Sequence, residues 1–135
     1  MSQKLKLNVV TPDKQLVSEE VDQVNAPGSE GDFGILYDHA PFLTNLRSGQ
    51  LSYENDGETT ALVIGGGYLE VTENRVTILA ETGEFLNEID RERAQLARSE
   101  AEEKLSDPDL SEEEFSETQK KLFRAIARLE NSENN

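Results

Sequence analysis

Apolar and polar residues alternate with a period of two along most of the first 87 residues. The alternating or β-branched runs are LKLNVV, KQLVSEEVDQV, GQLSYE, TTALVIGG, GYLEV and RVTILA. Successive side chains of a strand point to opposite faces, so this period is typical of strands with one buried face. Turn-forming residues such as Asp56-Gly57 and Asn74 separate several of the runs. The pattern predicts an antiparallel β-sandwich or barrel over residues 1–87.

A helical pattern replaces this alternation in residues 88–135. From Asp90, the run DRERAQLARSEAEEKL contains no β-branched residue. Small or apolar residues recur in it at helical spacing, namely Ala94, Ala97, Ala101 and Leu105. Such a narrow stripe favours close packing on a partner helix.

A second helix is predicted beyond the breaking segment SDPDLS. Ser111 and Glu114 have the spacing of a capping box. The residues that then recur on one face are Phe115, Leu122, Ile126 and Leu129. The sequence therefore predicts an all-β sandwich domain, 1–87, followed by an α-helical hairpin domain, 88–135. Helices of this length are marginal in isolation, so the hairpin must pack on another surface, and it could do so reversibly.

Charge excludes some classes of function. The chain has 13 basic and 28 acidic residues, a formal charge of −15. Five basic and 14 acidic residues give residues 1–87 a charge of −9, and eight basic and 14 acidic residues give 88–135 a charge of −6. The whole molecule repels polyphosphate backbones and anionic membrane surfaces, so we expect no nucleic-acid binding.

Composition also limits location and chemistry. No run approaches the roughly 20 apolar residues that span a bilayer, and the first residues, MSQKLKLNVVTPDKQ, alternate instead of forming the apolar segment of a signal peptide. We expect a soluble, unexported chain, with the cytoplasm as the default. With no cysteine, thiolate nucleophiles and cysteine-ligated metals are excluded.

The triplet Gly65-Gly66-Gly67 is the first candidate binding motif. A phosphate-binding loop must lead into a helix whose N-terminal amides meet the phosphate. Here the residues that follow, YLEVTENRVTI, continue as a strand. The pattern favours a bulge or a close sheet-to-sheet approach over a phosphate loop.

His39, the only histidine, is the second candidate. A catalytic triad needs a nucleophile oriented by the base, and neither Ser29 nor Ser48 has the signature of a nucleophile elbow. One histidine with scattered carboxylates does not predict a metal site, and we expect neither a catalytic residue nor a metal. The motif His39-Ala40-Pro41 is interpreted as a loop at the rim of the sandwich, with His39 fixing it.

Long motifs in the chain resemble the epsilon subunit of the bacterial F-type ATP synthase, called delta in mitochondria. The motifs are PGSEGDFGILYDHAPFLTNLRSGQL, IGGGYLEV, VTILAE and IDRERA, and their order covers essentially the whole chain. The pattern G-x-x-G-I-L-x-x-H-A-P-x-L-T-x-L-x-x-G runs without a gap from Gly31 to Gly49. It is far more specific than a lone glycine motif.

This resemblance implies a non-catalytic rotor part of the central stalk. In this family the sandwich grips the gamma subunit and sits on the membrane-embedded ring of c subunits, so that rotation driven by protons or sodium ions reaches the catalytic head of alpha and beta subunits. Glu30, Asp32 and His39 lie in the region that matches the ring contact, although a solvated acidic loop is the alternative. The implied location is peripheral, at the cytoplasmic face of the bacterial inner membrane, through the complex alone.

The resemblance also implies that the hairpin is regulatory. In many relatives it either folds against the sandwich or extends into the catalytic head, where it suppresses ATP hydrolysis. The basic residues of the last helix that could contact the beta subunit there are Lys120, Lys121, Arg124 and Arg128. A solvated basic face that balances nearby glutamates is the alternative interpretation.

The resemblance implies no required cofactor. Some family members, however, bind one regulatory ATP between the folded hairpin and the sandwich. Their I/L-D-x-x-R-A motif is matched at Ile89, Asp90, Arg93 and Ala94. Glu84 matches a further contact, and Arg124 and Arg128 match a pair of arginines four residues apart. That spacing places both guanidinium groups on one helix face.

Two observations weaken the ATP interpretation. Strong binders have an additional arginine where this chain has Glu100, with Arg98 nearby. Asp90 could serve only as a helix N-cap, and Arg93 as a surface partner of Glu88 or Glu92. A different class of function, a free-standing ligand-binding sandwich or a helical adaptor, has no motif in its favour.

Overall fold

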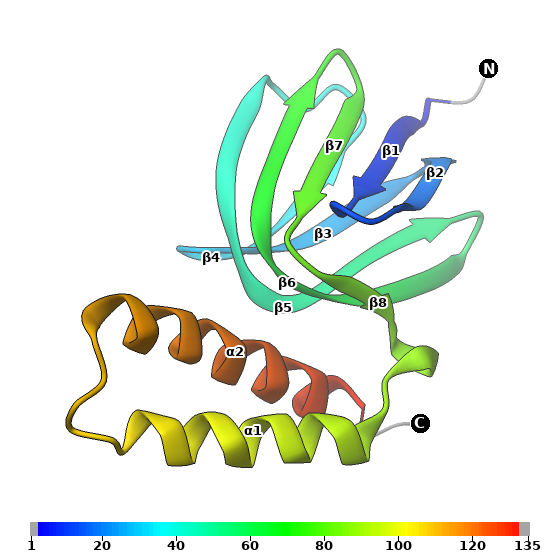
Figure 1. Ribbon diagram of the computed structural model, residues 1–135. Coiled ribbons are helices and arrows are strands. Elements are labelled where there is room, and N and C mark those ends of the chain that lie inside the picture. Colours follow the sequence, from blue (N-terminus) through cyan, green and yellow to red (C-terminus); the bar gives the residue numbers. More distant parts are fainter. Residues whose placement is uncertain (1–2, 133–135) are drawn as a thin grey trace.

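The computed structural model describes residues 3–132, which form a β-sheet unit followed by two helices (Figure 1). The outermost residues of the two predicted domains, 1–2 and 133–135, lie outside the described residues. The strands are β1 Leu5–Val10, β2 Gln15–Val21, β3 Gln23–Gly28, β4 Gly31–Leu36, β5 Phe42–Asn55, β6 Glu58–Thr72, β7 Arg75–Ala80 and β8 Gly83–Phe85. A 3-10 turn, η1 Leu86–Glu88, leads into α1 Arg91–Leu105 and α2 Glu112–Asn131.

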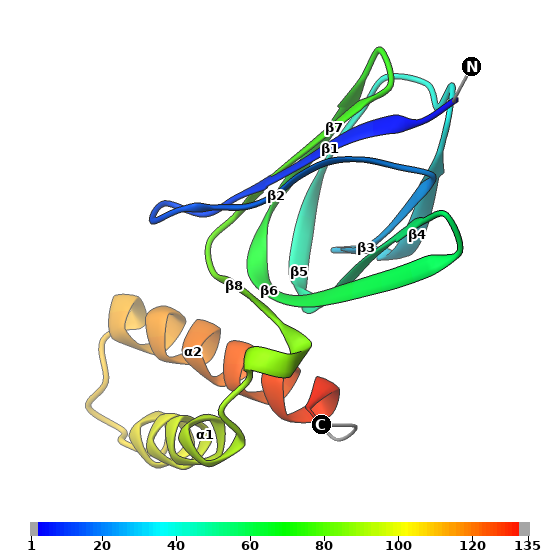
Figure 2. The same cartoon turned by 90° about the vertical axis from the view of Figure 1, so that its right-hand side faces the viewer.

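All eight strands belong to one hydrogen-bonded sheet that folds back on itself. Its order is β2-β1-β7-β6-β5-β3-β4, and β8 pairs with β6. Neighbours are antiparallel except for β1 and β7, which are parallel. The second half of β6 pairs with β7 and its first half with β8, so the long strands β5 and β6 pass through both layers (Figure 2). The predicted sandwich is confirmed.

The core lies between the two layers and follows the period of two. In β1, Leu5, Leu7 and Val9 are fully buried, whereas the residues between them are half-buried. Both layers contribute large side chains that exclude solvent, among them Ile35, Leu51, Leu62, Ile64, Leu69 and Ile78. Burying each such side chain contributes about 1.5–3 kcal/mol, which makes this core the main source of stability.

The glycine triplet lies where β6 passes from one layer to the other. Pairing with β7 ends at Gly67, and pairing with β8 begins at Ile64. Gly66 and Gly67 have φ values of 93° and 144°, a region that side chains rarely adopt. A Cβ on Gly67 would lie 2.1 Å from the carbonyl oxygen of Leu79. The glycines therefore permit a close backbone approach to β7, the neighbouring strand of the same sheet, and not the sheet-to-sheet approach that the sequence suggested.

Two sequence-based strand assignments were wrong, and one strand was not predicted. The run 14–24 is two strands, β2 and β3, which meet at Asp22; the Asp22 carboxylate accepts a hydrogen bond from the Asp56 amide at 2.8 Å. The runs 59–66 and 67–71 are one strand, because the glycines bend it without interrupting it. Strand β4, Gly31–Leu36, which pairs along its length with β3, has no counterpart among the predicted strands. Residues 37–41, which include the predicted His39-Ala40-Pro41 loop, lie between strands.

The helical hairpin is confirmed, with both caps where the sequence placed them. The side chain of Asp90 accepts a hydrogen bond from the Arg93 amide at 3.1 Å, and that of Ser111 accepts one from the Glu114 amide at 3.1 Å. Each bond satisfies one free amide of a helix N-terminus. On the predicted apolar face of α2, Leu129 is buried, but Phe115 is 45% exposed because it lies in the first turn, near the free end of the hairpin.

Helix α2 lies between α1 and the sandwich in both views (Figures 1 and 2). It packs on β5 and β6, and α1 packs on α2. The small residues Ala94 and Ala101 of α1 are buried, as the narrow stripe predicted. Within residues 3–132, no helix has the length and apolarity needed to cross a bilayer.

Candidate functional site

Two arginines of α2 connect the hairpin to the sandwich. Arg124 Nη2 lies 2.6 Å from Glu81 Oε2, and its Nε donates to the Gly65 carbonyl oxygen at 3.4 Å. Arg128 Nε lies 2.5 Å from Glu84 Oε1. All four charged side chains are partly shielded from solvent. The spacing of four residues thus places both guanidinium groups on the face that meets the sandwich, as expected.

A cavity of about 350 Å³ lies beside the second of these pairs. Its lining consists of Glu84, Glu88, Asp90, Arg93, Ala94, Ala97 and Arg128. Five of the seven residues that the resemblance implies for ATP contact therefore surround one space. Of the other two, Arg124 lines a neighbouring cavity of about 280 Å³, and Ile89 is half-buried in the segment that leads into α1.

The local roles of Asp90 and Arg93 are now defined. Asp90 is the N-cap of α1, which agrees with the purely structural interpretation of this residue. Among the described residues, no ion pair joins Arg93 to Glu88 or Glu92. Glu88 instead accepts a hydrogen bond from the Phe85 amide at 3.2 Å. The Arg93 guanidinium is consequently available at the rim of the cavity.

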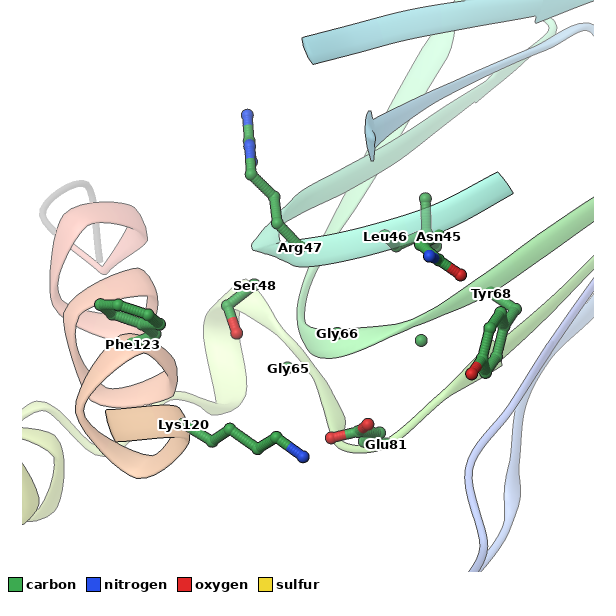
Figure 3. A pocket seen from close by; sticks show the side chains of 11 residues that line it. Asn45, Leu46, Arg47, Ser48, Gly65, Gly66, Tyr68, Glu81, Lys120 and Phe123 are labelled. Carbon is green, nitrogen blue, oxygen red and sulfur yellow. The ribbon is translucent and has the colours of Figure 1, made fainter. Parts of the chain in front are cut away.

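The four basic residues expected to contact the catalytic head do not form one surface here. Arg124 and Arg128 face carboxylates of the sandwich, and Lys121 lines the cavity of about 280 Å³ between the helices. Lys120 lines another cavity, of about 300 Å³, beside the glycine triplet, where it points toward Glu81 (Figure 3). Helix packing thus places Lys121, Arg124 and Arg128 on one cavity and Lys120 on another.

The three residues expected at the ring contact are also divided. Glu30 is exposed in the turn between β3 and β4, and Asp32, on β4 itself, pairs with Arg47. His39 lies beyond the opposite end of β4, where its Nδ1 is 2.7 Å from the Ala40 carbonyl oxygen. The structure brings Glu30 and Asp32 together and leaves His39 apart.

His39 contacts its own loop. Its ring packs against Phe42 with centroids 5.8 Å apart, and Phe42 in turn makes an edge-to-face contact with Phe33 at 5.4 Å. The neighbouring Asp38 amide donates to Asn74 Oδ1 at 2.7 Å, which joins this loop to the turn between β6 and β7. Within residues 3–132, no three histidine or acidic side chains are placed to hold a metal ion.

Three side chains of the sandwich have pKa values displaced from their ordinary values. The Asp56 backbone amide, together with Lys4, lowers the pKa of Asp22, and hydrogen bonds to the carboxylates of Asp56 and Asp22 raise the pKa of Lys4. Burial raises the pKa of Tyr53. Lys4 Nζ lies 3.2 Å from Asp22 and 2.9 Å from Asp56, so this group joins the N-terminal strand to the turn between β5 and β6.

Sequence reasoning missed two contributors to the interface between hairpin and sandwich. Glu81 follows β7 and holds Arg124, and Thr82 lines the cavity between the helices. Glu81 ends the motif VTILAE but had no role assigned to it, and no motif marks Thr82. The one available signal was the spacing of Glu81 and Glu84, three residues apart and just before the hairpin, opposite two arginines four residues apart.

Comparison with known proteins agrees with this architecture. The chain matches the families described as "ATP synthase, Delta/Epsilon chain, beta-sandwich domain" over residues 4–85 and "ATP synthase, Delta/Epsilon chain, long alpha-helix domain" over residues 87–133. The ATP synthase epsilon chain of Geotalea daltonii is 45% identical over 130 residues, which cover 96% of this chain and 94% of that relative.

Solved structures show the same fold. A chain of the Euglena gracilis mitochondrial ATP synthase, solved by cryo-EM as OSCP/F1/c-ring, has a TM-score of 0.79 and 27% identity, covering 94% of this chain and 80% of that chain. A chain of the Tetrahymena thermophila central stalk/c-ring structure, at 14% identity and a TM-score of 0.64, shares the fold. On these matches and this architecture, the chain belongs to the delta/epsilon family of ATP synthase subunits.

Proposed function

We propose that this chain is a non-catalytic rotor subunit in the central stalk of an F-type ATP synthase. Residues 1–87 would bind the gamma subunit and the c-ring, and residues 88–135 would regulate hydrolysis in the head of alpha and beta subunits. The proposal rests on family membership over both parts of the chain and on the relative from the Euglena complex, whose structure contains F1 and a c-ring. The location would be peripheral, on the cytoplasmic face of the inner membrane, through the complex.

The sandwich is suited to transmit rotation. Its two layers share β5 and β6 and enclose one core, and a packed core of this kind resists deformation. Glu30 and Asp32 project from one end of β4 and are acidic, which suits charge-assisted contacts with basic residues of a ring loop. His39, at the other end, would support the fold of its loop instead of sharing that contact.

The observation that supports regulation best is the pairing of Arg124 and Arg128 with Glu81 and Glu84. In this folded form, both arginines are paired with carboxylates of the sandwich. If the hairpin detaches, both are freed together with Lys120 and Lys121, and the four could meet an acidic surface of the beta subunit. The folded and extended forms then compete for the same arginines.

A regulatory ATP would shift the equilibrium between the folded and extended forms of the hairpin. Five of the expected contact residues line the cavity of about 350 Å³, contributed by the end of the sandwich and by both helices. A ligand there would stabilise the folded hairpin by at most its difference in affinity for the two forms. Glu100 faces the neighbouring cavity in place of the arginine of strong binders, so we expect weak binding.

The stalk role is tested by co-purification with a gamma subunit. We expect a stable complex at micromolar concentration, formed equally by a chain that ends after residue 87. Failure of the full-length chain to bind gamma would overturn the proposal.

The regulatory role is tested by hydrolysis assays of a reconstituted catalytic head. The full-length chain should inhibit, and the chain that ends after residue 87 should not. Equal inhibition by both would show that the hairpin is not the inhibitory element.

The ATP role is tested by calorimetry of the isolated chain. We expect saturable binding at millimolar ATP and its loss in the Arg93→Ala, Arg124→Ala double variant. No binding and no thermal stabilisation at millimolar ATP would exclude regulation by ATP, while leaving the stalk and inhibitory roles intact.

A further inference from the structure

Arg91, the first residue of α1, contacts the end of the other helix. Its Nη1 donates to the Leu129 carbonyl oxygen at 3.2 Å and to Ser132 Oγ at 2.9 Å. The two helices run in opposite directions, so the start of α1 lies beside the end of α2 (Figure 1). Arg91 stands at a variable position of the I/L-D-x-x-R-A motif, and nothing in the sequence assigns it a role.

This contact serves polar groups at the end of α2. The last four carbonyl groups of a helix have no intrahelical partner, and Leu129 carries one of them, because α2 ends at Asn131. Ser132, the C-cap of α2, is only 4% exposed, and its hydroxyl donates to the same Leu129 carbonyl oxygen at 3.3 Å. A buried hydroxyl and a terminal carbonyl thus meet one guanidinium, which also complements the negative end of the helix dipole.

The same position is unfavourable for α1 itself. A cation in the first turn of a helix opposes the helix dipole, whereas the acidic Asp90 and Glu92 on either side of Arg91 favour it. Among residues 3–132, no ion pair joins Arg91 to a carboxylate. The Arg91 charge is therefore stabilised by the end of α2 and not by its own helix. If the helices separated, α2 would lose this contact and α1 would keep an unfavourable cation.

The Arg91 contact differs from the ion pairs of the hairpin. Within the described part of the chain, none of the ion pairs joins α1 to α2. Arg124 and Arg128 pair with the sandwich, and Arg98 pairs with Glu102 inside α1. The folded hairpin thus has two kinds of polar contact: ion pairs that attach α2 to the sandwich, and the Arg91 contact that joins the two helices to each other.

We infer that Arg91 clamps the two helices of the folded hairpin together, so that α2 leaves α1 only when this contact breaks. The effect of the clamp on hydrolysis rests on the proposed inhibitory role of the extended hairpin. A weaker clamp raises the population of separated helices, and the apparent affinity of the chain for the catalytic head rises with that population.

The clamp is tested by hydrogen exchange of individual amides in the full-length chain. Arg91→Ala removes the donors, and Arg91→Glu also repels the negative end of α2, while both substitutions favour α1 as a separate helix. We expect exchange in the last two turns of α2 and the first two turns of α1 to be about fivefold faster in Arg91→Ala, and faster still in Arg91→Glu. Sandwich amides should exchange at the wild-type rate, which would show that the fold is intact.

Arg98→Ala is the matched control. Arg98 lies on the same helix as Arg91 and lines the same cavity of about 600 Å³, but its ion pair is with Glu102 of α1. This variant should change exchange by no more than about twofold. Faster exchange confined to the last turn of α2 would overturn the inference, since a clamp must affect both helices. Slower exchange in Arg91→Glu would also overturn it, because only the preference of α1 alone would then be visible.

A hydrolysis assay of the reconstituted catalytic head separates the clamp from the proposed function. Arg91→Ala should inhibit at about fivefold lower concentration than the wild-type chain, and Arg98→Ala at the wild-type concentration. Faster exchange with unchanged inhibition would reject the regulatory effect of the clamp and support the clamp itself. A wild-type chain that does not inhibit would reject the proposed regulation, and the exchange rates would still decide whether Arg91 is a clamp.

Discussion

Arg128 Nε lies 2.5 Å from Glu84 Oε1, and this pair joins the last helix of the chain to the strand that leads into the first helix. The two residues are 44 positions apart. Since α1 packs on α2, a contact that holds α2 also holds α1. The pair therefore helps to hold both helices against the sandwich, together with the buried apolar side chains of α2.

The first prediction concerns these ion pairs. The Glu81→Gln, Glu84→Gln double variant should lower the free energy of detaching the hairpin from the sandwich by about 1 kcal/mol, because each partly exposed pair contributes roughly 0.5 kcal/mol. Hydrogen exchange of α2 amides should then be about fivefold faster, with sandwich amides unchanged. Glu102→Gln is the control, since the Arg98–Glu102 pair lies within α1. Equal acceleration by both variants would show that the pairs to the sandwich have no special role.

The second prediction concerns the contact between the helices. Ala101 is buried against α2, so Ala101→Leu should overpack this interface and cost the hairpin about 1–3 kcal/mol. Circular dichroism should show helix melting at a lower temperature. Leu96 of α1 is 61% exposed, so Leu96→Ala should change the stability of the hairpin by no more than about 0.5 kcal/mol. A larger effect at Leu96 than at Ala101 would contradict the observed packing.

The third prediction concerns the bend in β6. Gly67→Ala combines an unfavourable φ with a clash against the Leu79 carbonyl oxygen, and we expect a loss of more than about 2 kcal/mol in urea unfolding. Gly57 also has a positive φ, 85°, but open space around its Cβ position. Gly57→Ala should therefore cost only about 1 kcal/mol, from backbone strain alone. If Gly67→Ala and Gly57→Ala lowered stability equally, the contact between the added Cβ and the Leu79 carbonyl oxygen would have no energetic effect.

The fourth prediction is a pH dependence set by Asp22. Because the folded state lowers the pKa of Asp22 below its ordinary 3.8, the ionised carboxylate stabilises the fold above that value. This stabilisation is lost as the pH falls through the folded-state pKa. Asp22→Asn should be less stable than wild type at neutral pH, and the difference should shrink below pH 3.8. A difference that stays constant down to pH 2 would contradict this assignment.

Local rules in the sequence predicted the helices well. The N-caps Asp90 and Ser111 lie where their side chains and the following pattern placed them, because capping depends on groups within three residues. The buried alanines of α1 were likewise visible as a stripe. These features need no knowledge of the rest of the chain.

Features that depend on distant residues were predicted poorly. Gly31–Leu36 contains two glycines and was not predicted as a strand, although it pairs along its length with β3. Strands β2 and β3 meet at Asp22, whose carboxylate accepts a hydrogen bond from the Asp56 amide, 34 positions away. Lys104 of α1 and Lys121 of α2 line one cavity because the two helices pack on each other, and the charge pattern of either helix alone does not indicate this.

The passage of β5 and β6 through both layers has a mechanical consequence. In a sandwich of two separate sheets, the layers can slide over each other by breaking side-chain contacts alone. Here two backbone strands, hydrogen-bonded to each other along nearly their whole length, continue around the fold between the layers. Sliding or twisting one layer against the other must therefore bend or unzip this β-ribbon, so the unit should respond to torque as a single elastic body.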